Sequence, residues 1–165
     1  MNELPLPMQV TLPSPDWVRV DANPGSEDDP AFAAIRRNLA HDVVPTIRLT
    51  GGRRDDAATL VQIAAALVAA AAEEASSVEI LDRHEVGGNN APGLTQALAI
   101  VGAPESRGLE LRRSHVLLAM LDVHDPTKRV VVLAELACAA DQFAEMAQEF
   151  QSFVANIRLN RTGES

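Results

Sequence analysis

Charged residues and histidines that could perform acid–base or metal chemistry lie closest together at Asp82, Arg83, His84 and Glu85. In a strand, Asp82 and His84 would share one face and Arg83 and Glu85 the other, because strand side chains alternate. None of the histidines lies at the spacing of a metal-binding motif such as HExxH; they are His41, His84, His115 and His124. We interpret the group as ordinary strand residues, with a zinc site assembled from several strands as the alternative.

A second candidate is the glycine-containing segment from Thr50 to Asp56, which connects a predicted strand to a predicted helix. A helix N-terminus can bind an anion through its unpaired N–H groups. However, the segment matches neither a P-loop nor the GxGxxG motif, and Asp55 and Asp56 occupy the place that an anion would take. We therefore interpret it as a turn followed by a helix N-cap.

Nucleophilic catalysis has no recognisable signature, because no serine lies in a GxSxG elbow. Cys138 is the single cysteine, so neither an intramolecular disulfide nor a thiolate metal cluster can form. It lies in the apolar stretch 136–140, which predicts a buried structural thiol. The sequence thus assigns no catalytic, cofactor-binding or metal-ligating residue, although catalytic groups can converge from distant segments.

Length and charge limit the class of protein further. The chain has 165 residues, 47% of them hydrophobic, and a formal net charge of −9. This length fits one domain with a substantial core, and the negative charge disfavours binding to nucleic acid or to an anionic membrane surface. Residues 1–8 lack the pattern of a signal peptide, and no segment has the roughly 20 apolar residues of a membrane span. We expect a cytoplasmic protein.

The predicted fold is organised around a long β-hairpin over residues 108–140. The first arm becomes apolar on both faces at 116–121, and the second arm, 129–136, is almost continuously apolar. A turn at 125–128 connects them, with proline at its second position. A strand that is apolar on both faces must be covered on both, so the hairpin is predicted to lie mid-sheet with a layer on each side.

Further strands are predicted within a single domain, 8–159, between an N-terminal arm, 1–7, and a C-terminal tail, 160–165. Residues 31–37 fit either a strand or a helix, and we favour a strand. Residues 87–93 are predicted to be a loop. The additional predicted strands, most of which alternate, cover 8–12, 17–21, 31–37, 45–50, 78–86 and 97–101.

Two helices are predicted, over residues 56–75 and 141–157. The first has Asp55 or Asp56 as its N-cap, and the chain after the second is predicted to be a loose tail. Apolar residues at helical spacing predict the buried stripe of each helix. These stripes are Leu60, Ile63, Ala64, Leu67 and Ala71 in the first, and Phe143, Met146, Phe150, Phe153 and Ile157 in the second.

The first helix is apolar around most of its circumference, which bears on self-association. One interpretation is a monomer with an alanine-rich outer face, because exposed alanine adds little apolar area. The other is that Val61, Ala65 and Val68 lie against a second copy in a two-fold homodimer. We favour the dimer and predict these three residues as its contact.

The order of elements resembles the PsbP-like superfamily, in particular its LpqN-like bacterial branch. The features are a strand and prolines before Trp17, an Ile47-Arg48-Leu49 strand leading into the first helix, the long hairpin, and the closing helix at 150–157. The resemblance covers residues 8–159 and implies an antiparallel sheet with helices on both faces. It also implies a noncatalytic role exerted through protein partners, but it transfers no binding residue. The chain lacks the lipidation cysteine of the lipoprotein branch near its start.

We therefore predict an α+β domain with α/β/α layers that acts as a noncatalytic accessory domain for a protein partner, without a cofactor. One alternative is a carrier of a small apolar ligand, with a pocket between the sheet and helix 56–75. Another is a hydrolase without a recognisable motif. An enclosed cavity above ~300 Å³ would favour the carrier, whereas a buried serine or histidine beside a carboxylate in a cleft would favour the enzyme.

Overall fold

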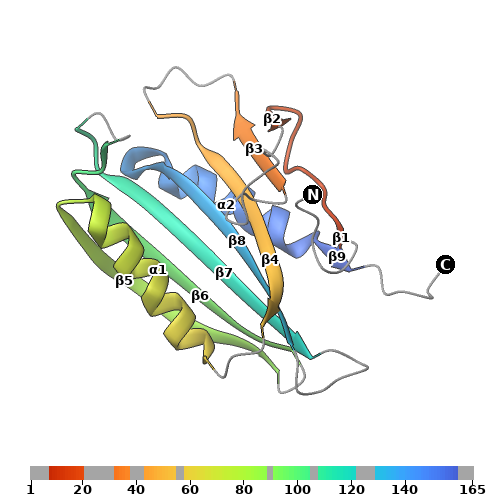
Figure 1. Ribbon diagram of the computed structural model, residues 1–165. Coiled ribbons are helices and arrows are strands. Elements are labelled where there is room, and N and C mark those ends of the chain that lie inside the picture. Colours follow the sequence, from red (N-terminus) through yellow and green to blue (C-terminus); the bar gives the residue numbers. More distant parts are fainter. Residues whose placement is uncertain are drawn as a thin grey trace.

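The architecture is an antiparallel sheet with helices on both faces, as a computed structural model shows for residues 8–20, 32–37, 43–54, 58–88, 91–104, 108–121 and 129–159. Helix α1 (Leu60–Glu74) lies on one face and α2 (Phe143–Ala155) on the other (Figure 1). The predicted α+β fold is confirmed. In spatial order the seven strands are β2 (Trp17–Val20), β3 (Phe32–Arg36), β4 (Thr46–Arg54), β8 (Arg129–Ala139), β7 (Leu111–Leu121), β6 (Ala91–Val101) and β5 (Ser77–Gly88).

The hairpin of β7 and β8 occupies the middle of this sheet, as its two apolar faces predict. Strand β8 lies between β4 and β7, and β7 lies between β8 and β6. On β8, Leu136 is buried on the α2 side and Val131 on the α1 side. The connecting residues 125–128 lie outside the described ranges. The strand predicted over 31–37 is also confirmed, by β3.

Helix α2 anchors the larger core cluster through Met146, Phe150 and Phe153, which are at most 2% exposed. The ring of Phe153 stacks on that of Phe32, with 5.7 Å between their centroids. Phe143 and Ile157 pack against the cluster while partly exposed. The aromatic stripe therefore faces the sheet as predicted. A short 3₁₀ turn, Ala140–Gln142, precedes the helix.

Helix α1 buries Ala64 and Ala71 against β6 and β7, with Leu60, Ile63 and Leu67 half-buried beside them. This confirms its predicted stripe. Its predicted start is wrong, because α1 begins at Leu60 with Thr59 as the N-cap. The Thr59 hydroxyl accepts a hydrogen bond from the Gln62 N–H, and the Gln62 side chain accepts one from the Thr59 N–H. This reciprocal capping box satisfies two N–H groups of the first turn. Asp55 and Asp56 lie outside the described residues.

Two segments predicted as loops continue as strand. Strand β4 runs through Gly51 to Arg54, in register with β8 along its whole length. Strand β5 extends to Gly88, and strand β6 begins at Ala91. Together they replace most of the loop predicted at 87–93. In both places a neighbouring strand supplies the backbone hydrogen bonds, which outweighs the weak strand preference of glycine. At Gly93 a side chain would meet the Leu117 carbonyl oxygen at 3.0 Å, so glycine permits this close pairing.

The two ends of the described chain pair with each other outside the main sheet. Strand β1 (Met8–Gln9) is antiparallel to β9 (Arg158–Leu159). The prediction that the loose tail begins at Arg158 is therefore wrong for these two residues. A two-residue strand has no local sequence signal, and β9 forms because β1 lies beside it.

Candidate functional site

A row of polar side chains crosses the α1 face of the sheet. Arg83 is in register with Gln96, Gln96 with His115, His115 with Glu135, and Glu135 with Arg48. Directly opposed residues of antiparallel strands project from the same face. The five residues therefore form one line across β5, β6, β7, β8 and β4, called here the polar row.

Hydrogen bonds connect the buried part of this row. Nε and Nη2 of Arg83 donate to Oε1 of Gln96 at 3.0 and 2.7 Å. Nε2 of Gln96 donates to the Ala64 carbonyl of α1 at 3.2 Å and lies 3.1 Å from Nδ1 of His115. Nε2 of His115 lies 2.9 Å from Oε2 of Glu135. Gln96 and His115 are 2% and 1% exposed, so their polar atoms need these protein partners.

The network also fixes the tautomer of His115. Because Oε1 of Gln96 accepts from Arg83, its Nε2 must be the atom that faces His115. Nδ1 of His115 then accepts a hydrogen bond, and its Nε2–H donates to Glu135. Both ring nitrogens of His115 are thus used inside the protein.

Glu135 is ionised at neutral pH. Burial raises the pKa of its carboxyl group, but the hydrogen bond from His115 and the charges of Arg113 and Arg48 outweigh burial. The pKa of Glu135 is therefore lower than usual. Its side chain is 19% exposed, so this carboxylate lies at the boundary between the buried row and the outer part of the sheet face.

A histidine beside a carboxylate was the observation that would favour a hydrolase. The pair is present, but the His115 ring is 1% exposed and has no nitrogen directed at a cleft. Ser114, its neighbour in β7, is in register with the buried Leu136 and projects from the opposite face. The arrangement thus holds strands and helix together and does not present a base to a substrate.

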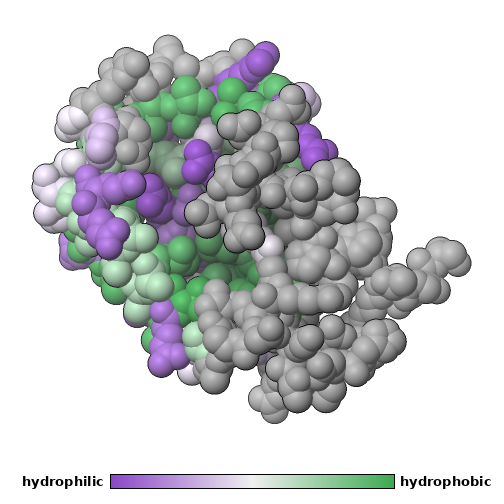
Figure 2. Space-filling model, in the orientation of Figure 1, coloured by the Kyte–Doolittle hydropathy of each residue, from purple (hydrophilic) through white to green (hydrophobic). Residues whose placement is uncertain are grey.

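The sheet face around Arg48 and Glu135 is open, because α1 packs mainly on β5, β6 and β7 and meets β8 at Val131 and Leu133. On the α2 side of β4 and β8, Ile47, Leu49 and Leu136 are 0% exposed. On the α1 side Val131 and Ala139 of β8 are buried, but the residues between 46 and 50 of β4 and between 133 and 137 of β8 are half-buried or exposed. We call these residues the open sheet face: Thr46, Arg48, Thr50, Leu133, Glu135 and Ala137. Figure 2 shows this side of the molecule, where hydrophilic residues border a hollow with hydrophobic residues at its floor.

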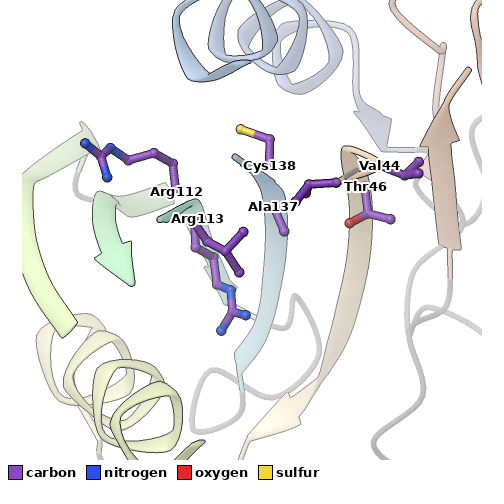
Figure 3. Close-up of a pocket in the computed structure, with 8 residues that line it drawn as sticks. Val44, Thr46, Arg112, Arg113, Ala137 and Cys138 are labelled. Carbon is purple, nitrogen blue, oxygen red and sulfur yellow. The ribbon is translucent and has the colours of Figure 1, made fainter. Parts of the chain in front are cut away.

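A small pocket of about 160 Å³ lies at one end of the open sheet face. Figure 3 shows Arg112 and Cys138 directed towards α2, while Arg113 points to the opposite side of the sheet. A second pocket, about 400 Å³, is a groove at the N-terminal end of α1 that is open to the surface. Between the two pockets, α1 packs directly on the sheet, and the buried side chains of Ala64, Leu94 and Leu117 fill this contact. Neither pocket matches the enclosed cavity expected of an apolar-ligand carrier.

The residues predicted for self-association do not form one exposed surface. Val61 is 40% exposed and Ala65 is exposed, but Val68 is half-buried and packs against the core beside Ala71. Their contact with a second copy stays a prediction. Asp82 and His84 do share a face of β5, with an Nε2 to Oδ1 distance of 2.5 Å, and both are solvent-exposed.

The described ranges contain neither a side-chain grouping typical of a metal site nor a helix that could span a membrane. There, no three residues among His, Cys, Asp and Glu are grouped so as to hold a metal ion. None of the helices in these ranges has the length and apolarity that crossing a membrane requires. His41 and His124 lie outside the described residues.

Sequence reasoning missed Gln96 and Glu135 as parts of the site. Glu135 is the lone polar residue in the apolar run 130–136, and Gln96 has Thr95 as the one other polar residue in the run 94–100. A polar residue in the middle of a buried strand is the signal that could have found them, because such a residue needs a partner.

The fold is similar to those of several solved structures, although the sequence itself has no match. The sequence matches no protein family and no curated protein. Among solved structures, the fold is similar to LpqN of Mycobacterium tuberculosis, a protein involved in cell envelope biogenesis, with a TM-score of 0.69 and 9% identity over 95% of this chain and 86% of that one. It is also similar to cyanobacterial PsbP (CyanoP) of Synechocystis, with a TM-score of 0.54 and 14% identity over 88% and 83% of the two chains. A third similar structure is PA94 of Pseudomonas aeruginosa, a protein of unknown function described as a putative regulator, with a TM-score of 0.52 and 9% identity over 95% and 85%.

These similarities show that the fold is PsbP-like. The LpqN structure shares this fold, as the resemblance seen in the sequence implied.

Proposed function

We propose that this protein is a noncatalytic accessory domain that binds a protein partner through the open sheet face. The observation that carries the proposal is the difference between the two faces of β4 and β8. Helix α2 covers one face, where Ile47, Leu49 and Leu136 are fully buried, whereas the other face presents the exposed Arg48, the half-buried Leu133 and the partly exposed Glu135. A mixture of apolar area with arginine is typical of protein interfaces.

The polar row supports this proposal, because it holds Glu135 in place before any partner arrives. His115 is buried and binds Glu135, and Gln96 binds His115. A side chain that is already fixed loses little conformational entropy when it enters an interface. A partner would thus meet a positioned carboxylate beside the arginine of β4.

The roles named for the similar structures are compatible with an accessory function. LpqN is described as involved in cell envelope biogenesis, and PA94 as a putative regulator. Neither description names a reaction. The partner of this protein would be recognised by surface complementarity to a sheet face that carries one positive and one negative group.

The test is affinity capture from the native host with two matched variants. Thr50→Arg places a long charged side chain on the open sheet face, and Gln148→Arg places the same side chain on the exposed surface of α2, across the sheet. We expect wild type and Gln148→Arg to retain the same partner, and Thr50→Arg to bind it at least about tenfold more weakly. Equal retention by Thr50→Arg, with both variants folded by circular dichroism, would contradict the proposal.

A further inference from the structure

Strand β5 forms one edge of the sheet and has an unusually large exposed surface. It is 12 residues long, whereas β2 at the other edge has 4 (Figure 1). Its exposed apolar residues are Ile80, Leu81 and Val86, at 43%, 45% and 43%. An edge strand has a row of backbone N–H and C=O groups without a strand partner, so another strand can pair with it.

The charges of β5 are arranged differently on its two faces. On the α1 face Arg83 and Glu85 lie two residues apart, in register with Gln96 and Leu94. On the other face Asp82 and His84 already contact each other. Nε and Nη2 of Arg83 bind Gln96, which holds the guanidinium in position while Nη1 carries further donors.

Two copies of β5 can pair antiparallel about a two-fold axis perpendicular to the sheet. This axis keeps the same face of both sheets on one side, so only residues of the same face are directly opposed. If the axis passes through Asp82, Arg83 or Glu85, that residue opposes its own copy, and like charges face each other. If it passes through His84, Arg83 opposes Glu85 of the second copy and Glu85 opposes Arg83 of the second copy.

We propose that β5 is a self-association edge, at which a second copy of this chain pairs antiparallel with the centre at His84. Two symmetric ion pairs between Arg83 and Glu85 set the register, and Val86 lies opposite Asp82 of the second copy. The irregularity between Ile80 and Asp82 interrupts the strand, so we place the pairing on residues 82–86. This inference is independent of the proposed function, which uses the other half of the α1 face.

This arrangement is distinct from a dimer through α1. Helix α1 contacts β5, β6 and β7 and is centred near β6, so each α1 axis would lie about one and a half strand spacings of about 4.8 Å from the two-fold axis. The two α1 axes would thus be roughly 14 Å apart. Direct helix packing requires 8–10 Å. A β5 dimer therefore leaves Val61 and Ala65 outside the main contact, which separates the two interfaces experimentally.

The test is sedimentation equilibrium of the full chain at about 5–100 µM, a range that detects micromolar dissociation constants. We expect wild type to dimerise. Glu85→Arg, an exposed position, places arginine opposite Arg83 twice and should weaken the dimer at least about tenfold. Arg83→Glu places like charges together in the same way. An equimolar mixture of the two variants restores both ion pairs, so it should dimerise although neither variant does alone.

Val61→Glu combined with Ala65→Glu is the control and should leave the dimer intact. Thermal unfolding of each variant checks folding, because Arg83→Glu also loses its hydrogen bonds to Gln96. A monomeric wild type at the highest concentration overturns the inference. A Glu85→Arg variant that dimerises like wild type also overturns it. The same holds for a mixture that stays monomeric while both variants are folded, and for a dimer that is lost only in the Val61→Glu, Ala65→Glu control.

Discussion

The Nε2 atom of His115 lies 2.9 Å from Oε2 of Glu135, and this contact joins the two central strands β7 and β8. Replacing Glu135 by glutamine keeps the shape and removes the charge, so we expect a loss of about 1–3 kcal/mol in the free energy of unfolding at pH 7. Urea unfolding of both proteins measures this difference.

The pH dependence of that difference gives a sharper test. The pKa of Glu135 is lower in the folded protein than in the unfolded chain. Its contribution is therefore fully present above the unfolded pKa, about 4.3, and is lost as the pH falls through the folded pKa. The difference in unfolding free energy between wild type and Glu135→Gln should therefore become smaller below about pH 4. Glu145→Gln on the exposed surface of α2 is the control. If the difference in unfolding free energy between wild type and Glu135→Gln does not change with pH, the ionised Glu135 is not its cause.

The closing helix gives the second prediction. Phe150 is 2% exposed at the middle of the α2 stripe, so Phe150→Ala should cost about 3–5 kcal/mol in unfolding free energy. Gln151→Ala, the exposed neighbour, should change stability by less than about 0.5 kcal/mol. A loss below about 1 kcal/mol for Phe150→Ala in urea would show that this ring is not a core contact.

Cys138 gives the third prediction. Its side chain is buried, and burial raises the pKa of the thiol to about 12. At pH 8 the thiol therefore stays protonated and shielded, and a small thiol reagent should modify it only at the rate at which the protein unfolds. The same reagent added in urea provides the fast reference. Rapid labelling of the native protein would contradict the assignment.

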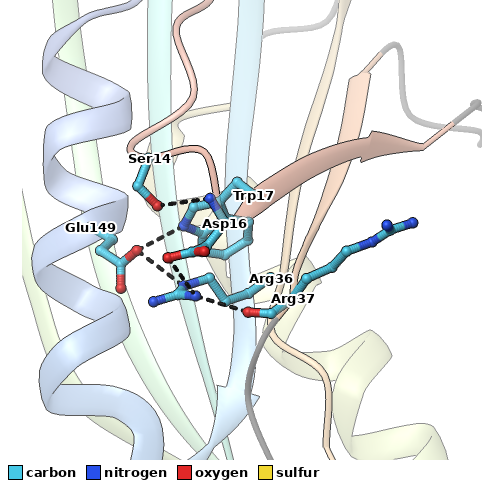
Figure 4. A network of polar contacts seen from close by, with 6 residues as sticks. All are labelled: Ser14, Asp16, Trp17, Arg36, Arg37 and Glu149. Atoms are coloured by element: carbon cyan, nitrogen blue, oxygen red, sulfur yellow. Dashed lines mark hydrogen bonds and ion pairs between the residues drawn. The ribbon is translucent and has the colours of Figure 1, made fainter.

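The fourth prediction concerns the connection of β2 and β3 to α2. Oε1 of Glu149 accepts hydrogen bonds from Nε1 of Trp17 at 2.9 Å and Nε of Arg36 at 3.2 Å (Figure 4). Nη1 of Arg36 also lies 3.3 Å from Oδ2 of Asp16. Glu149→Ala leaves the indole N–H and the guanidinium without this acceptor, and should cost about 1–3 kcal/mol.

Trp17 is the single tryptophan, so its fluorescence reports this contact directly. Glu149→Ala should shift the native emission spectrum, whereas Gln148→Ala on the exposed surface of the same helix should not. An unchanged spectrum together with unchanged stability would mean that the indole has no contact with Glu149 in solution.

Much of the fold could be predicted from the sequence, because burial leaves a local periodic pattern. The spacing of Phe150 and Phe153 predicted the buried face of α2, and the doubly apolar arms predicted that β7 and β8 lie mid-sheet. The ends of elements were predicted less well. Helix α1 begins after Thr59, and β4 passes through Gly51, because capping and strand pairing outweigh the preferences of single residues.

The sequence by itself determined which faces are apolar, and so a sheet with a layer on each side, while the resemblance implied that the sheet is antiparallel and covered by helices. Only the tertiary structure decided the polar row. Arg83, Gln96, His115, Glu135 and Arg48 come from five strands, and they meet because the register of each strand against the next aligns them. Register depends on pairings between distant segments, and a shift by one residue would move each side chain to the opposite face. The local pattern of any one strand therefore cannot specify which polar residues become partners.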